Sequence, residues 1–278
     1  MNEYDTAIQR PKILPPKVDV VFKLLFGDER NTDILIDFLK SVLSLSEDEY
    51  DKITITDTHL KRETIDDKLG VVDVKLTTKN GTIIHIEIQV AKETAFPERI
   101  TYYNAKMLVT QLKSSEEYLE LDKVITIAIA DFEIFKQNNM YHHIFQLQEK
   151  STGLKLTDRV EIHTLELEKI PKETDNTAKY DWLQFLRTES EEEFEMLSER
   201  NPAIKKAVVE LKRLSQDEEA QMLYEARQKA AMDEKSRMRG MQREIATNFL
   251  KMGISVEQTA EGTGLPVTIV EKLKNNID

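Results

Sequence analysis

The chain of 278 residues contains no cysteine. This absence excludes a disulfide scaffold, a thiolate zinc site and a cysteine nucleophile. Only eight residues are glycine, and none of them forms a glycine-rich loop of the kind that cradles phosphates. No apolar run approaches the about 20 residues that a membrane helix needs. The first residues also lack the apolar stretch of a secretory signal, so we expect a cytoplasmic protein with no membrane partner.

The chain has fewer basic than acidic residues, 39 lysines and arginines against 51 aspartates and glutamates, which gives a formal net charge of -12. Lysine and arginine contacts to phosphates dominate nucleic-acid binding, so this acidity argues against tight, non-specific binding of DNA. A bound divalent cation offsets part of that objection, since such an ion can dominate the local field. Charged residues make up 32% of the chain, which indicates exposed helices, and the apolar 40% suffices for a core.

The pattern of apolar residues divides the chain into four parts. Residues 1–16 are polar, end in two prolines and are expected to form an extended arm. An α/β part follows over 17–170, and a helical region over 171–252. The last part, 253–278, resembles a helix-turn-helix unit with Gly264 in its turn. Its second helix begins without arginine, so we interpret it as a packing or assembly element and expect a homo-oligomer formed through the C-terminal helices.

Within the α/β part, spacing and composition predict individual elements. We expect helices near 18–26, 31–45 and 97–118, strands between 53 and 90, and further strands at 124–132 and 160–167.

Two of the strands frame a hairpin in the segment LGVVDVKLTTKNGTIIHIEIQV. Side chains alternate between the faces of a strand, so Glu87 and Gln89 point one way, while Ile84, Ile86, Ile88 and Val90 point to the core. On the preceding strand Val72, Val74 and Leu76 form the apolar set, and Asp73 faces away from them.

The length of the hairpin loop decides whether Asp73 meets Glu87. A two-residue Asn80-Gly81 loop would pair Asp73 with Ile88 and separate the carboxylates. A three-residue loop, Lys79 to Gly81, pairs Asp73 with Glu87 and gives Gly81 the left-handed conformation. Only the second register buries both apolar sets together, so we predict that one.

Two facing carboxylates repel each other across neighbouring strands, and a cation between them turns the repulsion into a binding site. Hard oxygen ligands suit Mg²⁺ or another divalent cation. Such an ion activates water and stabilises charge on a phosphoryl group. The alternative to a metal site is that Asp73 and Glu87 lie on an exposed polar face of an antiparallel sheet.

An acid, a hairpin turn and then Glu-x-Lys on an apolar strand form the signature of PD-(D/E)XK nucleases, and here the strand reads Glu87-Ile88-Gln89. The series DVVFKLLFG, LGVVDVKL, IEIQV, PERITYYNAKMLVTQL and YLELDKVITIAIADF resembles the recombination-promoting nuclease family, also described as PD-(D/E)XK nuclease family putative transposases. The resemblance covers about residues 17–135. It implies an α/β fold, a mixed sheet flanked by helices, followed here by a helical C-terminal region.

The resemblance also implies roles for single residues. Asp73 and Glu87 would bind the metal, Gln89 would take the usual lysine position, and Asp19 would match an additional helical acid. Because an amide carries no charge, the cation must come from elsewhere, and Lys75 is one candidate. A second candidate is the helical face of Arg99, Tyr103 and Lys106, for which a solvated face is the plainer interpretation.

The implied activity is metal-dependent endonucleolytic hydrolysis of DNA, linked to recombination or mobile elements. Two alternatives stay open. One is a catalytically weakened nuclease fold that acts as a DNA- or protein-binding regulatory module, favoured by Gln89 and the acidic charge. The other is a self-assembling structural protein. The histidines, among them His85 beside Glu87, are expected to have structural or solvent-facing roles.

Overall fold

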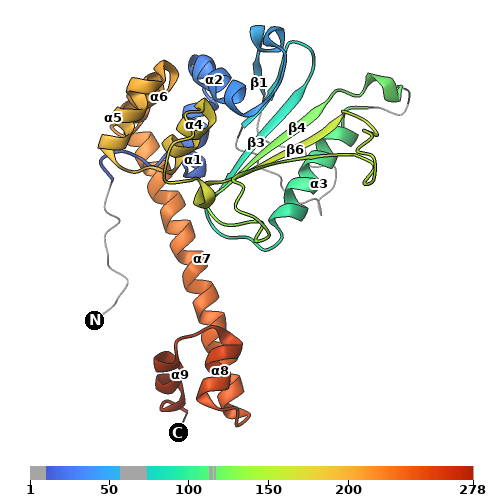
Figure 1. Ribbon diagram of the computed structural model, residues 1–278. Coiled ribbons are helices and arrows are strands. Elements are labelled where there is room, and N and C mark those ends of the chain that lie inside the picture. Colours follow the sequence, from blue (N-terminus) through green and yellow to red (C-terminus); the bar gives the residue numbers. More distant parts are fainter. Residues whose placement is uncertain (1–10, 57–73, 113–114, 116, 278) are drawn as a thin grey trace. The chain divides into compact units, whose positions relative to one another are not determined.

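A computed structural model describes residues 11–56, 74–112, 115 and 117–277. By its internal contacts the chain divides into two units, one of residues 9–224 and one formed mainly by 225–278. The first unit contains a six-stranded mixed sheet flanked by helices (Figure 1). The strands are β1 (Thr54–Thr56), β2 (Val74–Thr77), β3 (Ile83–Gln89), β4 (Val124–Ala130), β5 (His142–Gln146) and β6 (Val160–Glu166).

The strand order is β1-β2-β3-β4-β6-β5. β3, β4 and β6 run parallel to one another, whereas β1, β2 and β5 are each antiparallel to their neighbours. The expected strands at 124–132 and 160–167 are confirmed as β4 and β6. The edge strand β5, with the sequence HHIFQ, was not predicted.

The helices of the first unit are α1 (Asp19–Phe26), α2 (Thr32–Val42), α3 (Phe96–Val109), α4 (Ala178–Arg187), α5 (Glu191–Arg200) and α6 (Pro202–Leu214). Short 3-10 turns lie at η1 (Glu29–Asn31), η2 (Glu47–Asp51), η3 (Tyr118–Glu120) and η4 (Leu167–Lys169). α1 ends at Phe26 as expected, with Gly27 as its C-cap. α3 ends at Val109, so the prediction that it continues to Tyr118 is wrong.

The two faces of the sheet are covered by different helices. α3 lies on one face against β4 and β6, while α1, α2 and α4 lie on the other (Figure 1). The second face carries the larger apolar core, in which Phe26, Phe38 and Trp182 contact one another. The indole nitrogen of Trp182 donates to Asp37 Oδ2 at 2.8 Å, and Asn201 Nδ2 donates to the same oxygen at 2.9 Å. α4 to α6 therefore belong to the same packed core as the sheet.

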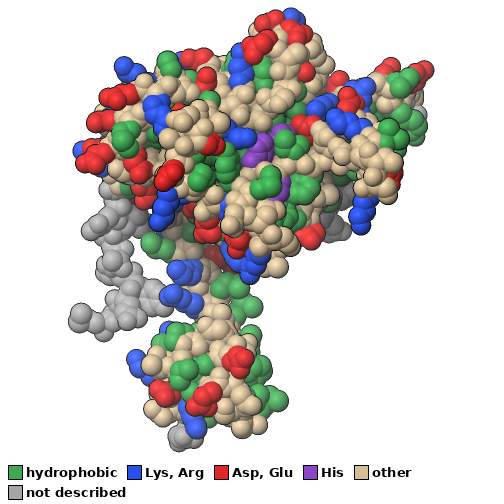
Figure 2. Space-filling model, viewed as in Figure 1, with side chains coloured by type: hydrophobic (Ala, Val, Ile, Leu, Met, Phe, Trp, Pro, Cys, Tyr) green, Lys and Arg blue, Asp and Glu red, His purple; other side chains and the backbone are tan. Residues whose placement is uncertain are grey.

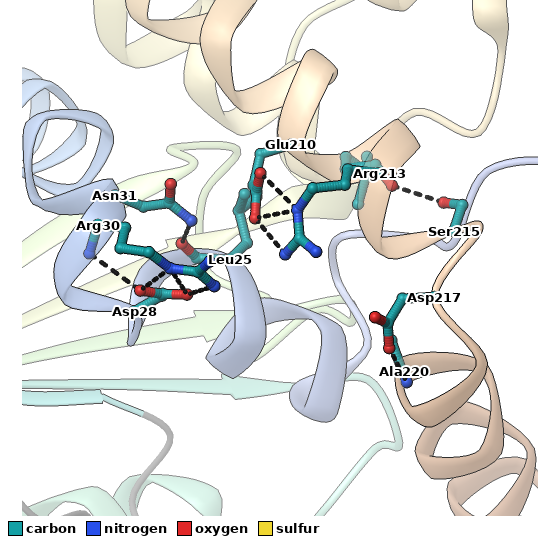
Figure 3. Close-up of polar contacts among 10 residues, drawn as sticks. Leu25, Asp28, Arg30, Asn31, Glu210, Arg213, Ser215, Asp217 and Ala220 are labelled. Carbon is teal, nitrogen blue, oxygen red and sulfur yellow. Dashed lines mark hydrogen bonds and ion pairs between the residues drawn. The ribbon is translucent and has the colours of Figure 1, made fainter.

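Polar contacts flank the place where η1 meets α6 (Figure 3). Asn31 is buried and donates to the carbonyl of Leu25 at 3.0 Å. Across from it, Glu210 accepts from Arg213 at 2.6 Å. The Arg213 hydrogen bond lowers the pKa of Glu210, and Asn31 and Arg30 act in the same direction. Asn31 and Arg30 of η1 therefore lie close enough to Glu210 of α6 to stabilise its charged form.

The second unit contains most of α7 (Glu218–Lys251), followed by α8 (Val256–Thr263) and α9 (Val267–Lys274). Gly264 ends α8 with a left-handed φ of 69°, as the turn pattern predicts. Ala246, Ala260, Leu265 and Val270 form a small core of this unit. Among the described residues, no helix combines the length and the apolar character needed to cross a membrane.

Candidate active site

The site is built on the hairpin of β2 and β3. Thr78 donates its backbone N–H to the carbonyl of Thr82 at 2.9 Å, which closes a loop of Lys79, Asn80 and Gly81. Gly81 has φ +91°, a conformation that favours glycine. The register pairs Val74 with Ile86 and Lys75 with His85. The predicted three-residue loop is thus confirmed over the described part, whereas Asp73 itself lies outside the described residues.

Over the described residues, which do not include Val72, the apolar face of this hairpin is packed as expected with one exception. Val74, Leu76, Ile84, Ile86 and Ile88 are at most 2% exposed. Val90 was expected to join them, but it is 42% exposed. The reason is that β3 ends at Gln89, so the alternation of faces does not extend to Val90.

Glu87 lies on the opposite face, where α3 covers it. Its side chain is 3% exposed, and Arg99 Nη2 lies 2.6 Å from Glu87 Oε1. This contact is an ion pair that lacks the geometry of a hydrogen bond, and neither carboxylate oxygen accepts a hydrogen bond from any residue that the structure describes. Burial raises the pKa of Glu87, an effect that the positive charge of Arg99 opposes and the negative charge of Glu93 reinforces. The alternative of an exposed polar face therefore does not describe this residue.

Arg99 stands in the first turns of α3 and connects two carboxylates. Its Nη1 donates to Glu93 Oε2 at 2.7 Å, while Nη2 faces Glu87. The guanidinium carbon lies 5.9 Å from the centre of the Tyr103 ring, within range of a cation–π contact. Tyr103 is buried, at 7% exposed, and Lys106 is half-buried. This helical face is therefore turned toward the sheet.

His85 is the next residue inward on the Glu87 face and is fully buried. Its two ring nitrogens have no hydrogen-bond partner within the described part of the chain. Burial lowers the pKa of His85 to about 3, and the charges of Lys75 and Arg99 add to this effect. Lys75 lies opposite His85 across the strand pair and is half-buried, and burial lowers its pKa as well.

Gln89 and Asp19 lie near the end of β3 and the start of α1. The Gln89 amide donates to the carbonyl of Ala91 at 3.0 Å. The backbone carbonyl of Gln89 accepts from the backbone N–H of Asp131. Asp131 Oδ2 lies 2.9 Å from Lys17 Nζ. Asp19 is the first residue of α1 and accepts from the N–H of Val20.

Sequence reasoning missed three residues around this site. Lys17 and Asp131 form an ion pair directly beside Gln89, and Glu93 holds the far side of Arg99. Asp131 is the first residue after the buried run VITIAIA, so its position at the carboxyl end of a parallel strand was a usable signal. Glu93 precedes α3 in an irregular segment, where no periodicity marks it.

A separate polar chain lies on the other face of the sheet, between β5, β6 and α4. Lys179 Nζ is 2.9 Å from His142 Nδ1, His142 Nε2 is 2.9 Å from His163 Nδ1, and His163 Nε2 is 2.8 Å from Glu161 Oε1. The ring of His142 borders a surface pocket of about 620 Å³. Burial lowers the pKa of His142 to about 3, so the imidazole stays neutral near pH 7. Figure 2 shows histidine atoms on this side of the molecule.

Comparison with known families settles which fold this is. The family model for PD-(D/E)XK nuclease family transposases matches residues 16–240. The chain belongs to this family. No curated protein matches it, and no solved structure does. The mixed sheet with flanking helices and a helical C-terminal region is consistent with the PD-(D/E)XK nuclease fold.

PD-(D/E)XK nucleases typically use divalent metals, so the described residues can be compared with that requirement. Within them, no group of three histidine, aspartate or glutamate side chains is arranged to hold a metal ion. Glu87 nonetheless offers a buried carboxylate to which no described residue donates a hydrogen bond. Arg99 contacts Oε1, whereas Oε2 has no hydrogen-bond partner among the described residues; buried polar atoms normally have partners, so this oxygen suits an ion. A hard cation prefers this oxygen donor, so Glu87 fits the role that the family implies.

Proposed function

We propose that this chain is a divalent-metal-dependent DNA endonuclease related to mobile elements, with Asp73 and Glu87 as metal ligands. The buried, hydrogen-bond-poor carboxylate of Glu87 carries the proposal. The described register of β2 and β3, continued by one residue, would bring Asp73 opposite Glu87. Mg²⁺ or a similar ion held there would activate water for attack on phosphorus and stabilise the developing charge.

The remaining residues of the site would bind and orient the substrate. Gln89 would orient water or a phosphate oxygen once its amide leaves the Ala91 carbonyl. Asp19 would approach the metal through water. Lys75, Arg99, Tyr103 and Lys106 would line the path of the DNA backbone.

A plasmid-nicking assay with Mg²⁺ or Mn²⁺ tests this proposal. We expect Asp73→Asn and Glu87→Gln each to abolish nicking, because loss of a ligand removes both water activation and charge stabilisation. Glu98→Gln is the matched control, since Glu98 is an exposed acid in the first turn of α3. Nicking that survives either ligand substitution, in metal-verified buffer, rules the site out.

A regulatory nuclease-fold protein without activity is the second candidate. It is favoured by the bond between the Gln89 amide and Ala91 and by the ion pair of Glu87 with Arg99. Gln89→Lys separates the two candidates. If the wild type is inert and only Gln89→Lys cuts DNA, the binding-module function replaces the enzyme.

We also propose that copies of the chain associate through the C-terminal helices in the cytoplasm. α7 exposes several large apolar side chains, including Met232, Met238, Met241 and Ile245. Light scattering on the full chain and on Met238→Lys/Met241→Lys tests this; a wild type that is monomeric at all concentrations excludes it.

A further inference from the structure

In this structure the partner of Glu87 is a cation from the protein itself. One guanidinium joins two carboxylates from different segments, with 2.6 Å to Glu87 and 2.7 Å to Glu93. The two acids differ in burial, because the Glu87 side chain is 3% exposed and that of Glu93 is 35% exposed. Arg99 is therefore bonded on one side to a buried carboxylate and on the other to a carboxylate near solvent.

The burial of Glu87 explains why a resident cation is needed. An uncompensated buried charge is strongly destabilising, and Arg99 neutralises this one when no metal is bound. A divalent ion that coordinates Glu87 through Oε1, alone or together with Oε2, competes with Arg99 for that oxygen atom. Metal binding then leaves the guanidinium with one carboxylate, Glu93, in place of two.

Arg99 also has capacity to bind a further group. Its Nε is buried and has no hydrogen-bond partner among the residues that the structure describes. The planar fork of a guanidinium matches two oxygens of a phosphate. Tyr103 lies beneath the group at 5.9 Å and Glu93 fixes one of its edges. The side chain would therefore stay close to the site after Glu87 is released.

We propose that Arg99 is a resident counter-ion that a divalent metal displaces from Glu87, and that the displaced guanidinium supplies the positive charge that Gln89 lacks. The inference rests on the proposed nuclease function. Lys75 is the rival source of charge on this face. Within the described residues Lys75 forms no ion pair, whereas Arg99 contacts the proposed metal ligand directly.

The first experiment measures Mn²⁺ affinity by titration calorimetry on the full chain. We expect Arg99→Met to bind Mn²⁺ about tenfold more tightly than the wild type, equivalent to about 1.4 kcal/mol, because the competing cation is gone. Arg200→Met is the distant control: Arg200 lies 3.1 Å from Asp181, with side-chain exposures of 35% and 9%. The Mn²⁺ affinity of Arg200→Met should equal that of the wild type.

A nearer control separates contact from long-range repulsion. Lys75→Met removes the same charge from the same face without removing a contact to Glu87. We expect it to tighten Mn²⁺ binding by less than Arg99→Met does. Equal shifts in the two variants, or an unchanged or weaker affinity of Arg99→Met, overturn the inference.

The second experiment measures DNA nicking at saturating Mn²⁺. Arg99→Met should lose about 100-fold in rate although it binds metal more tightly, since removing one preorganised electrostatic donor costs about that much. Arg99→Lys, which restores the charge without the fork, should recover part of the rate. Wild-type nicking by Arg99→Met overturns the inference.

The same titration distinguishes failure of the inference from failure of the proposed function. If Glu87→Gln binds Mn²⁺ as the wild type does, the metal site itself is excluded, whatever Arg99 does. If Glu87→Gln loses Mn²⁺ binding and Arg99→Met does not bind Mn²⁺ more tightly than the wild type, only the proposed counter-ion role of Arg99 is refuted. Circular dichroism confirms that each variant is folded, and Arg99→Gln replaces Arg99→Met if the latter is not.

Discussion

Replacing Gly81 by alanine perturbs the loop that sets the position of Glu87. A side chain at φ +91° is strained, and a non-glycine residue in the left-handed region costs about 1–2 kcal/mol. The new Cβ would also lie 2.5 Å from Asp122 Oδ1 and 2.9 Å from Asp122 Cγ, so the carboxylate must move. We expect a total loss of about 2–3 kcal/mol in the free energy of unfolding.

Urea denaturation followed by fluorescence of Trp182, the single tryptophan of the chain, measures this loss. For a unit of residues 9–224, each kcal/mol lowers the melting temperature by about 2–4 °C. Gly153→Ala is the matched control, because Gly153 has φ +72° but its nearest contact is 4.0 Å away. It should show the strain alone, about 1–2 kcal/mol.

Adding Asp122→Ala to Gly81→Ala tests the contact term separately. The backbone N–H of Asp122 donates to Gln111, and alanine retains that bond. The double variant should regain the difference between Gly81→Ala and Gly153→Ala. A stability gain of about 0.4–1 kcal/mol in Gly81→Ala, the usual result at an unstrained glycine, would refute the reasoning about the loop.

Two further outcomes follow from other contacts. Asp37→Ala should cost about 2 kcal/mol in urea denaturation, because it leaves Trp182 Nε1 and Asn201 Nδ2 without their acceptor; Asp33→Ala, which removes an exposed pair with Lys206, should cost less than about 1 kcal/mol. The hydrogen bond from His163 lowers the pKa of Glu161 to about 2, below its ordinary value of 4.5. Because the folded pKa is lowered, this stabilisation is present above about pH 4.5 and is lost as pH falls toward 2. Glu161→Gln should therefore flatten the pH dependence of stability in that window, and an unchanged acid transition would contradict the assignment.

The hairpin was predictable from the sequence because local pattern and core burial agree there. Only one loop length buries Val74 and Leu76 together with the isoleucines of β3, and the structure has that register over the described residues. The short strand β5 was missed because HHIFQ has neither an apolar run nor clean alternation. A strand of this kind is defined by its pairing with β6.

The surroundings of Glu87 could not be predicted in the same way. The alternation of side chains along β3 identified the face on which Glu87 lies but not the helix that covers it. Burial by α3 depends on the crossover connection between β3 and β4. Arg99 was recognised only as part of a helical face, and its partners Glu87 and Glu93 come from two other segments. The orphaned nitrogens of His85 likewise follow from packing that no local pattern encodes. Whether Asp73 completes the site stays a prediction.

The polar chain between α4 and β6 has a direction. While Lys179 carries its ammonium charge it can only donate, so His142 Nδ1 must accept. A neutral imidazole then holds its proton on Nε2, which obliges His163 to accept on Nδ1 and to donate from Nε2 to Glu161. One charge thus fixes the tautomers of two rings in series. These hydrogen bonds connect helix α4 to strands β5 and β6, and all of them point the same way. Reversing the direction of one bond would require reversing the others.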